Sequence, residues 1–295
     1  MPTKIEKDSL TGRHTTGHEW DGLQELNTPL PKWWLYTWIV CCLIAAVYIW
    51  LFPSIPLGRT YFHGWLAASS RGAVDADVRA LEAQRAFVMD KIKYTPIGQV
   101  KDDPQLLAVA TAAGRIAFAN NCQPCHGAGG EGRPGYPSLA DDTWLWGGKL
   151  ADIQQTITYG IRSGHEQARM SVMPSFGAAG LLTPAQIETV ADYVWGALYG
   201  HAEAGKDLSA GRAQFVETCA VCHGINGEGN RDVGAPPLKS AIHLYGDHRE
   251  TIVAQVTNPR LGVMPFWEKK TNATGLDEAT IKSVAIYVHA LGGGE

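Results

Sequence analysis

Two short motifs in this sequence combine cysteine and histidine at a spacing with a specific chemistry. Each is a Cys-x-x-Cys-His pentad, and the two comprise Cys122, Cys125 and His126, and Cys219, Cys222 and His223. In such a pentad the two thiols bond covalently to the vinyl groups of a haem while the adjacent imidazole binds its iron. The sequence therefore predicts two c-type haems, with His126 and His223 as axial ligands.

Other uses of paired cysteines explain the pattern less well. Zinc takes three or four ligands in a tetrahedron, and neither pentad has a second cysteine pair or a spaced histidine pair to complete one. A thioredoxin-like redox pair would lie in a βαβ pattern, which the sequence does not show. The remaining cysteines, Cys41 and Cys42, lie in an apolar run. No cysteine is left for a disulfide in the rest of the chain.

Methionine is the residue type expected at the other axial position of each iron. A low-spin electron carrier has both axial positions filled, and a thioether opposite histidine raises the reduction potential. Of five methionines, Met173 and Met264 both lie in a Val-Met-Pro sequence, one after each pentad. We predict these two as iron ligands, with Met170 and His165 as alternatives at the first haem. Pairing within a repeat is the simplest assignment, although the spacing also allows the two methionine segments to be exchanged.

The pentads lie in two copies of one longer pattern. GRIAFANNCQPCHG from Gly114 is repeated as GRAQFVETCAVCHG from Gly211, and LTPAQIETVADYVW from Leu182 is repeated as LDEATIKSVAIYVH from Leu276. The two later segments open with N-cap residues and then show apolar residues at helical spacing. Each repeat is therefore predicted to begin and end with a helix, and the fold class to be all-α.

The repeats resemble class I cytochrome c domains, in which the first and last helices cross at a glycine and an aromatic residue. The residues that could meet at the two crossings are Gly114 and Phe118 with Tyr193, and Gly211 and Phe215 with Tyr287. The resemblance also implies that the proline loops at 136–139 and 236–238 offer a carbonyl to the proximal histidines, which would fix the orientation of each ring.

An uncharged apolar run from residue 33 to residue 52 precedes the repeats. At a rise of about 1.5 Å per residue it spans the ~30 Å hydrocarbon core of a bilayer. Trp34 and Trp50 near its ends fit the aromatic belts of a membrane protein, and Pro53 ends the helix. A cleavable signal peptide is the alternative, but its apolar region is normally only ~7–15 residues long. We predict one uncleaved transmembrane helix.

The chain of 295 residues is long enough for this anchor and two small domains. Its net charge of −4 lacks the basic excess typical of nucleic-acid partners. The predicted parts are an N-terminal tail at 1–32, a transmembrane helix at 33–52, a linker at 53–104 with a helix over 74–93, and tandem cytochrome c domains at 105–200 and 205–295.

The segment HEWDGLQELNTPLPKWW, residues 18–34, makes the resemblance more specific. Together with the helix and the two repeats, it resembles the di-haem cytochrome c subunit of cbb3-type cytochrome c oxidases, some of which have two membrane helices instead of one. The resemblance implies a chain that is not an enzyme on its own. It would relay electrons through two haems from a periplasmic donor, such as a soluble cytochrome c, toward the oxygen-reducing subunit. Its implied partners are the catalytic haem–copper subunit, a mono-haem cytochrome c subunit and membrane lipid.

The resemblance also implies an orientation in the bacterial inner membrane. Because c-type haem is attached on the outer membrane face, the tail would be cytoplasmic and the haem domains periplasmic. The flanking charges Lys32, Arg59 and Arg71 do not decide this by the positive-inside rule.

Two alternative functions differ from this one. A di-haem peroxidase would leave one iron with an open sixth position, whereas both repeats supply a Met-Pro pair. A membrane-tethered di-haem shuttle for another respiratory reductase or dehydrogenase would differ only in its partners.

Overall fold

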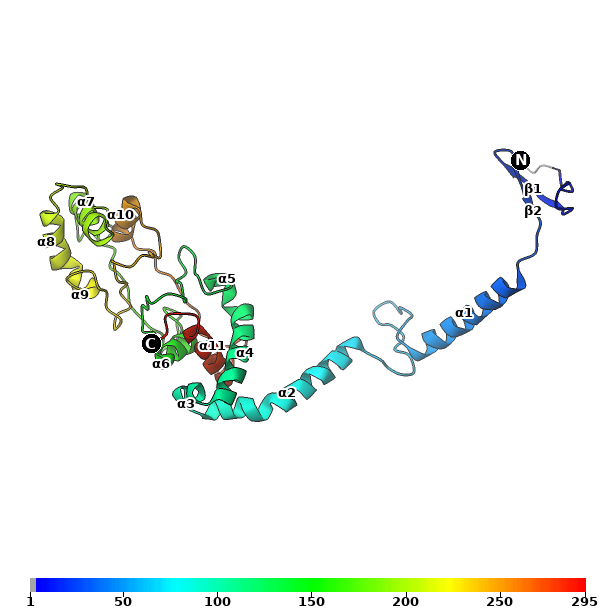
Figure 1. The fold of residues 1–295 in the computed structure, drawn as a ribbon, viewed down its shortest axis with the longest axis horizontal. Helices are drawn as coiled ribbons and strands as arrows, with labels where there is room; N and C mark the ends of the chain where they lie inside the picture. The colour runs from blue at the N-terminus through cyan, green and yellow to red at the C-terminus, as the bar shows by residue number, and fades with distance from the viewer. Residues whose placement is uncertain (1–3) are drawn as a thin grey trace. The chain divides into compact units, whose positions relative to one another are not determined.

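The computed structural model describes residues 4–295, so Met1 and the rest of the first three residues of the predicted tail lie outside the described part. The chain divides into two compact units, one up to Ala83 and one from Gln84 to Glu295. Figure 1 shows the helices and strands of both units. The first contains the apolar helix, and the second contains both Cys-x-x-Cys-His motifs.

A small β-hairpin occupies the N-terminal tail. Strand β1 (Thr15–Trp20) pairs antiparallel with β2 (Leu23–Leu26). Asp21 and Gly22 between them have φ angles of 50° and 83°, and two consecutive positive φ angles are typical of a tight hairpin turn. The all-α fold class predicted from the sequence did not include this hairpin, and the rest of the described chain contains helices and loops.

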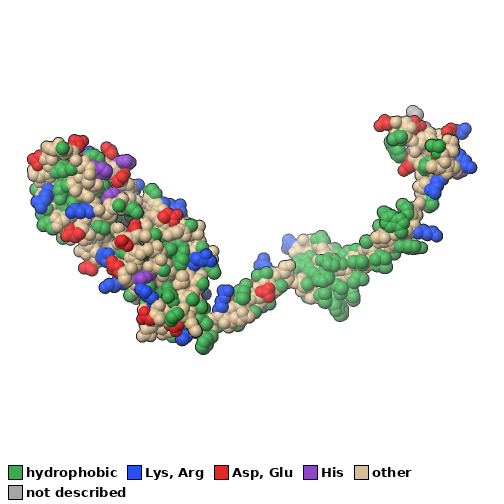
Figure 2. All heavy atoms as spheres, in the orientation of Figure 1, with side chains coloured by type: hydrophobic (Ala, Val, Ile, Leu, Met, Phe, Trp, Pro, Cys, Tyr) green, Lys and Arg blue, Asp and Glu red, His purple; other side chains and the backbone are tan. Residues whose placement is uncertain are grey.

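The apolar run forms one continuous helix, α1 (Lys32–Leu51), which begins one residue before the predicted start and ends one before the predicted end. Its mean hydropathy of 2.0 and the exposure of its apolar side chains are those of a membrane span. Figure 2 shows hydrophobic side chains gathered along this part of the chain. A helix that is hydrophobic all round needs an apolar environment, which here is lipid.

The segment after α1 first turns back on the helix end, where the backbone N–H of Trp65 donates to the carbonyl of Trp50 at 2.9 Å. Helix α2 (Ser70–Tyr94) then contains the helix predicted over 74–93.

The second unit is built from helices and loops. The bounds of its remaining helices are α3 (Ile97–Asp102), α4 (Pro104–Asn121), α5 (Gln123–His126), α6 (Leu150–Tyr159), α7 (Pro184–Tyr193), the π-helical turn η1 (Val194–Leu198), α8 (Ser209–Thr218), α9 (Ala220–His223), α10 (Arg249–Thr257) and α11 (Glu278–His289). Thr183 and Asp277 cap α7 and α11 with their side chains, as the sequence predicted.

The first and last helices of the two repeats pack in an exchanged arrangement. Helix α4 of the first repeat packs against α11 of the second, and α7 of the first packs against α8 of the second (Figure 1). At the first crossing, Phe118 lies against Tyr287 with ring centroids 5.3 Å apart. At the second, Phe215 lies against Tyr193 at 5.4 Å.

The glycines at these crossings confirm the exchange. A Cβ atom on Gly114 would lie 2.1 Å from the carbonyl oxygen of Ser283, and one on Gly211 would lie 2.4 Å from that of Thr189. Only glycine permits such close approach of two helix backbones. The expected crossings within each repeat, Gly114 with Tyr193 and Gly211 with Tyr287, are therefore wrong.

The duplication itself provides a physical reason for the exchange. Tyr193 and Tyr287 hold the same place in the repeated block, so α7 and α11 offer similar faces to either early helix. The short connection from α7 through η1 to α8 then favours contact between these successive elements.

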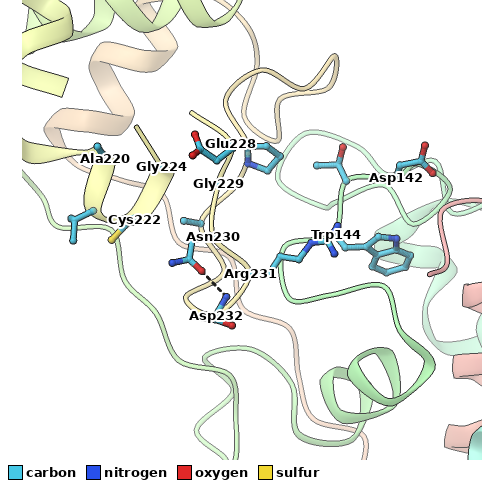
Figure 3. Close-up of a pocket in the computed structure, with 14 residues that line it drawn as sticks. Asp142, Trp144, Ala220, Cys222, Gly224, Glu228, Gly229, Asn230, Arg231 and Asp232 are labelled. Carbon is cyan, nitrogen blue, oxygen red and sulfur yellow. Dashed lines mark hydrogen bonds between the residues drawn. The ribbon is translucent and has the colours of Figure 1, made fainter. Parts of the chain in front are cut away.

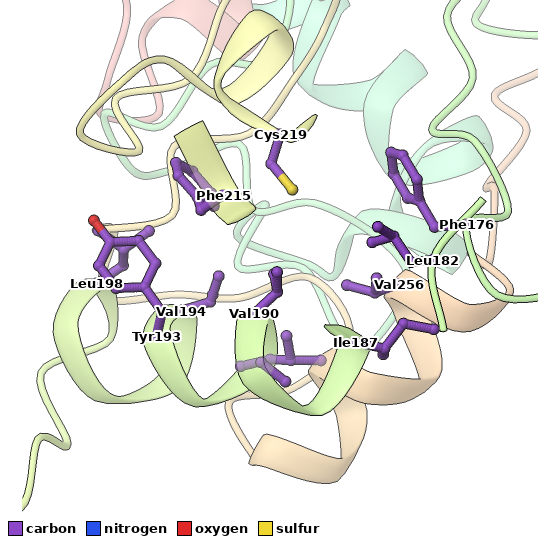
Figure 4. Packing of buried hydrophobic residues seen from close by; sticks show 12 residues of the cluster. Phe176, Leu182, Ile187, Val190, Tyr193, Val194, Leu198, Phe215, Cys219 and Val256 are labelled. Carbon is purple, nitrogen blue, oxygen red and sulfur yellow. The ribbon is translucent and has the colours of Figure 1, made fainter. Parts of the chain in front are cut away.

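The packed cores consequently do not coincide with the sequence repeats. We name each core after the pentad beside it. The second core, which contains Cys219, is built from one continuous stretch, with buried residues from Phe176 to Val256. Figure 4 shows the side chains of α7, α8 and α10 meeting in it around Cys219. The first core combines residues on both sides of that stretch, from Ala117 to Ile157 and from Ile281 to Val288. The second core is thus inserted in sequence between the two parts of the first.

Candidate functional site

The two pentads occupy equivalent short helices. Helix α5 follows α4 directly, with Cys122 as the residue between them, and α9 follows α8 in the same way through Cys219. Cys122 packs against the first core, and Cys219, 8% exposed, belongs to the second. The second thiol of the second pentad, at Cys222, is exposed. The second pentad thus presents one thiol to an apolar core and the other to the surface, whereas both cysteines of the first pentad are half-buried.

Both proximal histidines are oriented by a proline carbonyl. The Nδ1 atom of His126 lies 2.9 Å from the carbonyl oxygen of Pro137, and that of His223 lies 3.1 Å from that of Pro236. These are the contacts predicted for the two proline loops. Since Nδ1 donates to the carbonyl, the Nε2 lone pair is left for an iron. Burial lowers the pKa of both histidines, which keeps the imidazoles neutral and able to bind metal.

A repeated Gly-Glu-Gly turn holds the chain after each histidine. The N–H of Gly132 donates to the carbonyl of His126 at 2.7 Å, and Gly229 and His223 make the same contact at 2.7 Å. Both turn glycines have positive φ angles, 73° and 81°. In the first turn, the carboxylate of Glu131 accepts hydrogen bonds from the backbone N–H groups of Glu131 and Gly129, and these lower its pKa. The Gly-Glu-Gly repeat in the sequence therefore fixes the backbone beside both haem sites.

The two Val-Met-Pro methionines lie on the opposite cores from those expected within a repeat. Met264, from the second repeat, packs against the first core together with Cys122 and Trp144. Met173, from the first repeat, packs against the second core, which contains Cys219. Each core therefore has one histidine pentad and one methionine from different repeats.

The alternative ligands of the first haem face elsewhere. Met170 is 66% exposed. Both ring nitrogens of His165 have polar neighbours, because the N–H of Gln167 donates to Nδ1 at 3.0 Å and a carboxylate oxygen of Glu268 lies 3.5 Å from Nε2. Neither residue is among those packed against the core beside a pentad, as Met173 and Met264 are.

These residues fit a covalently bound haem better than a thiolate-bound metal. Among residues 4–295, no group of three or more His, Cys, Asp or Glu side chains is placed to hold a metal ion. Burial raises the pKa of the Cys122 and Cys219 thiols to about 11, as expected for cysteines in apolar surroundings. The fit to haem rests on three features at each site: a pair of thiols, an imidazole with a free Nε2, and an apolar core against which a methionine packs.

A cavity of about 620 Å³ lies beside the second pentad. Cys222 and Arg231 line one side of it, and Asp142 and Trp144 line the other (Figure 3). Its lining includes only the outer thiol of the pentad and neither His223 nor Met173, so the cavity is a polar cleft beside the second haem site and not the apolar crevice itself.

The duplicated pentads, their oriented histidines and the two apolar cores define a class of protein. Together with a membrane-spanning helix earlier in the chain, they are the features of a membrane-anchored di-haem c-type cytochrome.

Comparisons with known proteins narrow this class to a family. Residues 12–59 match the model of the N-terminal domain of cytochrome oxidase-cbb3, FixP. Residues 109–194 and 206–288 match that of cytochrome c oxidase, cbb3-type, subunit III. The chain belongs to the cbb3-type subunit III family.

Full-length relatives support the assignment. The cbb3-type cytochrome c oxidase subunit CcoP of Azospirillum sp. (strain B510) is 48% identical over 98% of both chains. The subunit FixP of Bradyrhizobium sp. (strain ORS 278) is 45% identical, and CcoP of Cereibacter sphaeroides is 44% identical, each over 100% of both chains. The protein is therefore an electron-transfer subunit of a cbb3-type oxidase with two c-type haems, and not a shuttle for another enzyme.

Proposed function

We propose that the two haem irons are six-coordinate, with axial ligands that come from different repeats. His126 and Met264 would bind the iron of the haem attached at Cys122 and Cys125. The other haem, attached at Cys219 and Cys222, would have His223 and Met173 as its axial ligands. The observation that carries this proposal is the packing of each methionine against the core that holds the other repeat's pentad.

This ligand set is suited to electron relay. A c-type haem exchanges one electron between its ferric and ferrous states, and methionine opposite histidine raises its potential. With both axial positions held by side chains, no iron has an open position for oxygen. The chain's residues would thus hold the haems in apolar surroundings and leave oxygen reduction to another subunit.

The proposed partners are the catalytic haem–copper subunit and a mono-haem cytochrome c subunit, with a soluble c-type cytochrome as the outer donor. Membership of the oxidase family and the membrane-spanning helix α1 support this assignment. We place α1 in the bacterial inner membrane, with the hairpin on the cytoplasmic side and the haem-binding unit in the periplasm, where c-type haem is attached.

Purification of the tagged full-length chain from gently solubilised membranes tests these partners. We expect haem b and copper to co-purify with c-type haem, and the preparation to oxidise reduced cytochrome c in a cyanide-sensitive reaction. A matched sample solubilised in a harsh detergent should retain the c-type haem but lose the haem b and the copper. Recovery of c-type haem alone under the gentle conditions would contradict the proposed assembly.

A further inference from the structure

The two segments that carry Met173 and Met264 are joined through one short stretch of backbone after α6. Ile161 and Met264 exchange two backbone hydrogen bonds, each 3.0 Å long. On the other side, the N–H of Arg162 donates to the carbonyl of Arg169 at 2.9 Å, and the N–H of Arg169 donates to the carbonyl of Gly160 at 3.0 Å. The stretch at 160–162 therefore lies between the segment that leads to Met173 and the segment that contains Met264.

The side chain of Arg162 spans the same two segments. Its Nε donates to the carbonyl oxygen of Gly262 at 2.7 Å, and one terminal nitrogen donates to that of Ser171 at 2.9 Å. Gly262 and Ser171 each lie two residues before a Val-Met-Pro methionine. The planar guanidinium, with several donors in a fixed fork, is suited to holding two acceptors at once. One side chain thus contacts both methionine segments at equivalent positions.

The backbone of Arg162 is in an unusual conformation. Its φ angle is 51°, in the left-handed region that residues with a Cβ atom rarely adopt. Such conformations persist only where surrounding contacts impose them, and they are concentrated at functional sites. Here the imposing contacts are the two backbone pairings and the forked side chain.

The guanidinium of Arg162 is half-buried and carries a charge that no carboxylate neutralises. Among residues 4–295, no Asp or Glu oxygen lies within ion-pair distance of it, whereas the nearby Arg169 pairs with Asp152 at 3.3 Å. A positive charge close to a haem disfavours the ferric state more than the ferrous state, because the ferric iron carries the larger positive charge. Arg162 contacts both methionine segments two residues before each methionine, so its charge lies close to both proposed sulfur ligands.

The second repeat contains a counterpart that lacks these contacts. Arg260 follows α10 at the same distance as Arg162 follows α6, but it is exposed. Its backbone N–H donates to the side chain of Gln255 at 3.0 Å, and its guanidinium lies 4.7 Å from the ring centroid of Tyr245. The guanidinium of Arg260 donates to the side chain of Gln255 and to the carbonyl of Tyr245, both at 3.4 Å. Contact with both methionine segments is therefore made by Arg162 and not by its counterpart, and Arg260 is a matched control.

We propose that Arg162 is a positioning residue shared by both haems, which holds the two methionine segments in register and raises both reduction potentials. This inference rests on the proposed ligation by Met173 and Met264. Ligand exchange at the two haems would then not be independent, because both methionine segments depend on one side chain.

The test uses the full-length haem-loaded chain in detergent and the variants Arg162→Gln, Arg162→Lys and Arg260→Gln. One readout is the weak red-end absorption band of ferric methionine-ligated haem and its rate of bleaching by added imidazole. The other is a potentiometric titration of both haems. For Arg162→Gln we expect several-fold faster bleaching at both haems and a fall in both midpoint potentials. Arg260→Gln should match the wild type in both readouts.

The lysine variant separates charge from geometry. Arg162→Lys keeps the charge but loses the fork, so we expect potentials close to wild type and bleaching that is still faster at both haems. If Arg162→Gln does not accumulate with haem, the bleaching rates of Arg162→Lys at the two haems test whether the side chain holds both methionine segments. A change at one haem only, no change at either, or an equal effect of Arg260→Gln would overturn the proposal. Absence of the methionine band in the wild type would instead contradict the proposed ligation itself.

Discussion

Replacing Met264 by leucine is expected to remove the sulfur ligand from the haem attached at Cys122 and Cys125, not from the haem in its own repeat. Leucine has a similar volume but no thioether, so the haem should stay attached while its iron becomes high-spin or takes another ligand. The reduction potential of that haem should fall. A tenfold weaker preference for the reduced state corresponds to about 59 mV for a one-electron couple, and we expect a larger fall than this.

A single-haem background identifies the haem that is affected. With Cys219→Ser and Cys222→Ser, only the first pentad binds haem covalently, and the red-end methionine band then reports on that site alone. In this background Met264→Leu should abolish the band, and the matched variant Met173→Leu should leave it in place. The reverse result would mean that each methionine binds the iron of its own repeat.

A chain that ends at Pro259 is expected to keep a methionine-ligated haem at the second pentad and to lose the one at the first. The truncation removes Met264 and α11, both of which pack in the first core. The buried residues of the second core, from Phe176 to Val256, all remain. If instead each repeat folded on its own, the same truncation would destroy the second site and spare the first.

Spectra of the truncated chain distinguish these outcomes when combined with cysteine substitutions. One methionine-ligated haem should remain, and Cys219→Ser with Cys222→Ser should remove its absorption band. The matched control, Cys122→Ser with Cys125→Ser in the truncated chain, should leave that band unchanged. Loss of the band in the control would contradict the nested arrangement of the two cores.

Much of the haem chemistry could be predicted from residue types and spacing. The pentads, the duplicated glycines and aromatics and the Val-Met-Pro pairs are local patterns with few alternative uses, and the family comparisons agree with the two c-type haems that they predict. The proline-loop carbonyls at Pro137 and Pro236 were also predicted, because they lie close in sequence to the histidines that they orient.

The exchange of the late helices could not be predicted in this way. Tyr193 and Tyr287 occupy the same position in two similar helices, so the sequence pattern alone allows either helix to pack on Gly114 or on Gly211. The choice depends on loop geometry and packing across the whole second unit. Long-range pairing of duplicated elements is therefore the part of this fold that local patterns leave open.

Two smaller features were missed for different reasons. The hairpin in the tail had a usable signal, because Asp21-Gly22 between alternating residues is typical of a tight turn between strands. The role of Arg162 had no signal in the sequence, because it depends on two carbonyl groups that only the folded chain places next to its side chain.

The iron–sulfur connectivity in a density map of the purified haem-loaded protein would show which methionine binds which iron. We predict that the sulfur of Met264 lies at the iron of the haem bonded to Cys122 and Cys125, with the imidazole of His126 on the opposite side. Finding Met173 at that iron would mean that each methionine binds the haem of its own repeat.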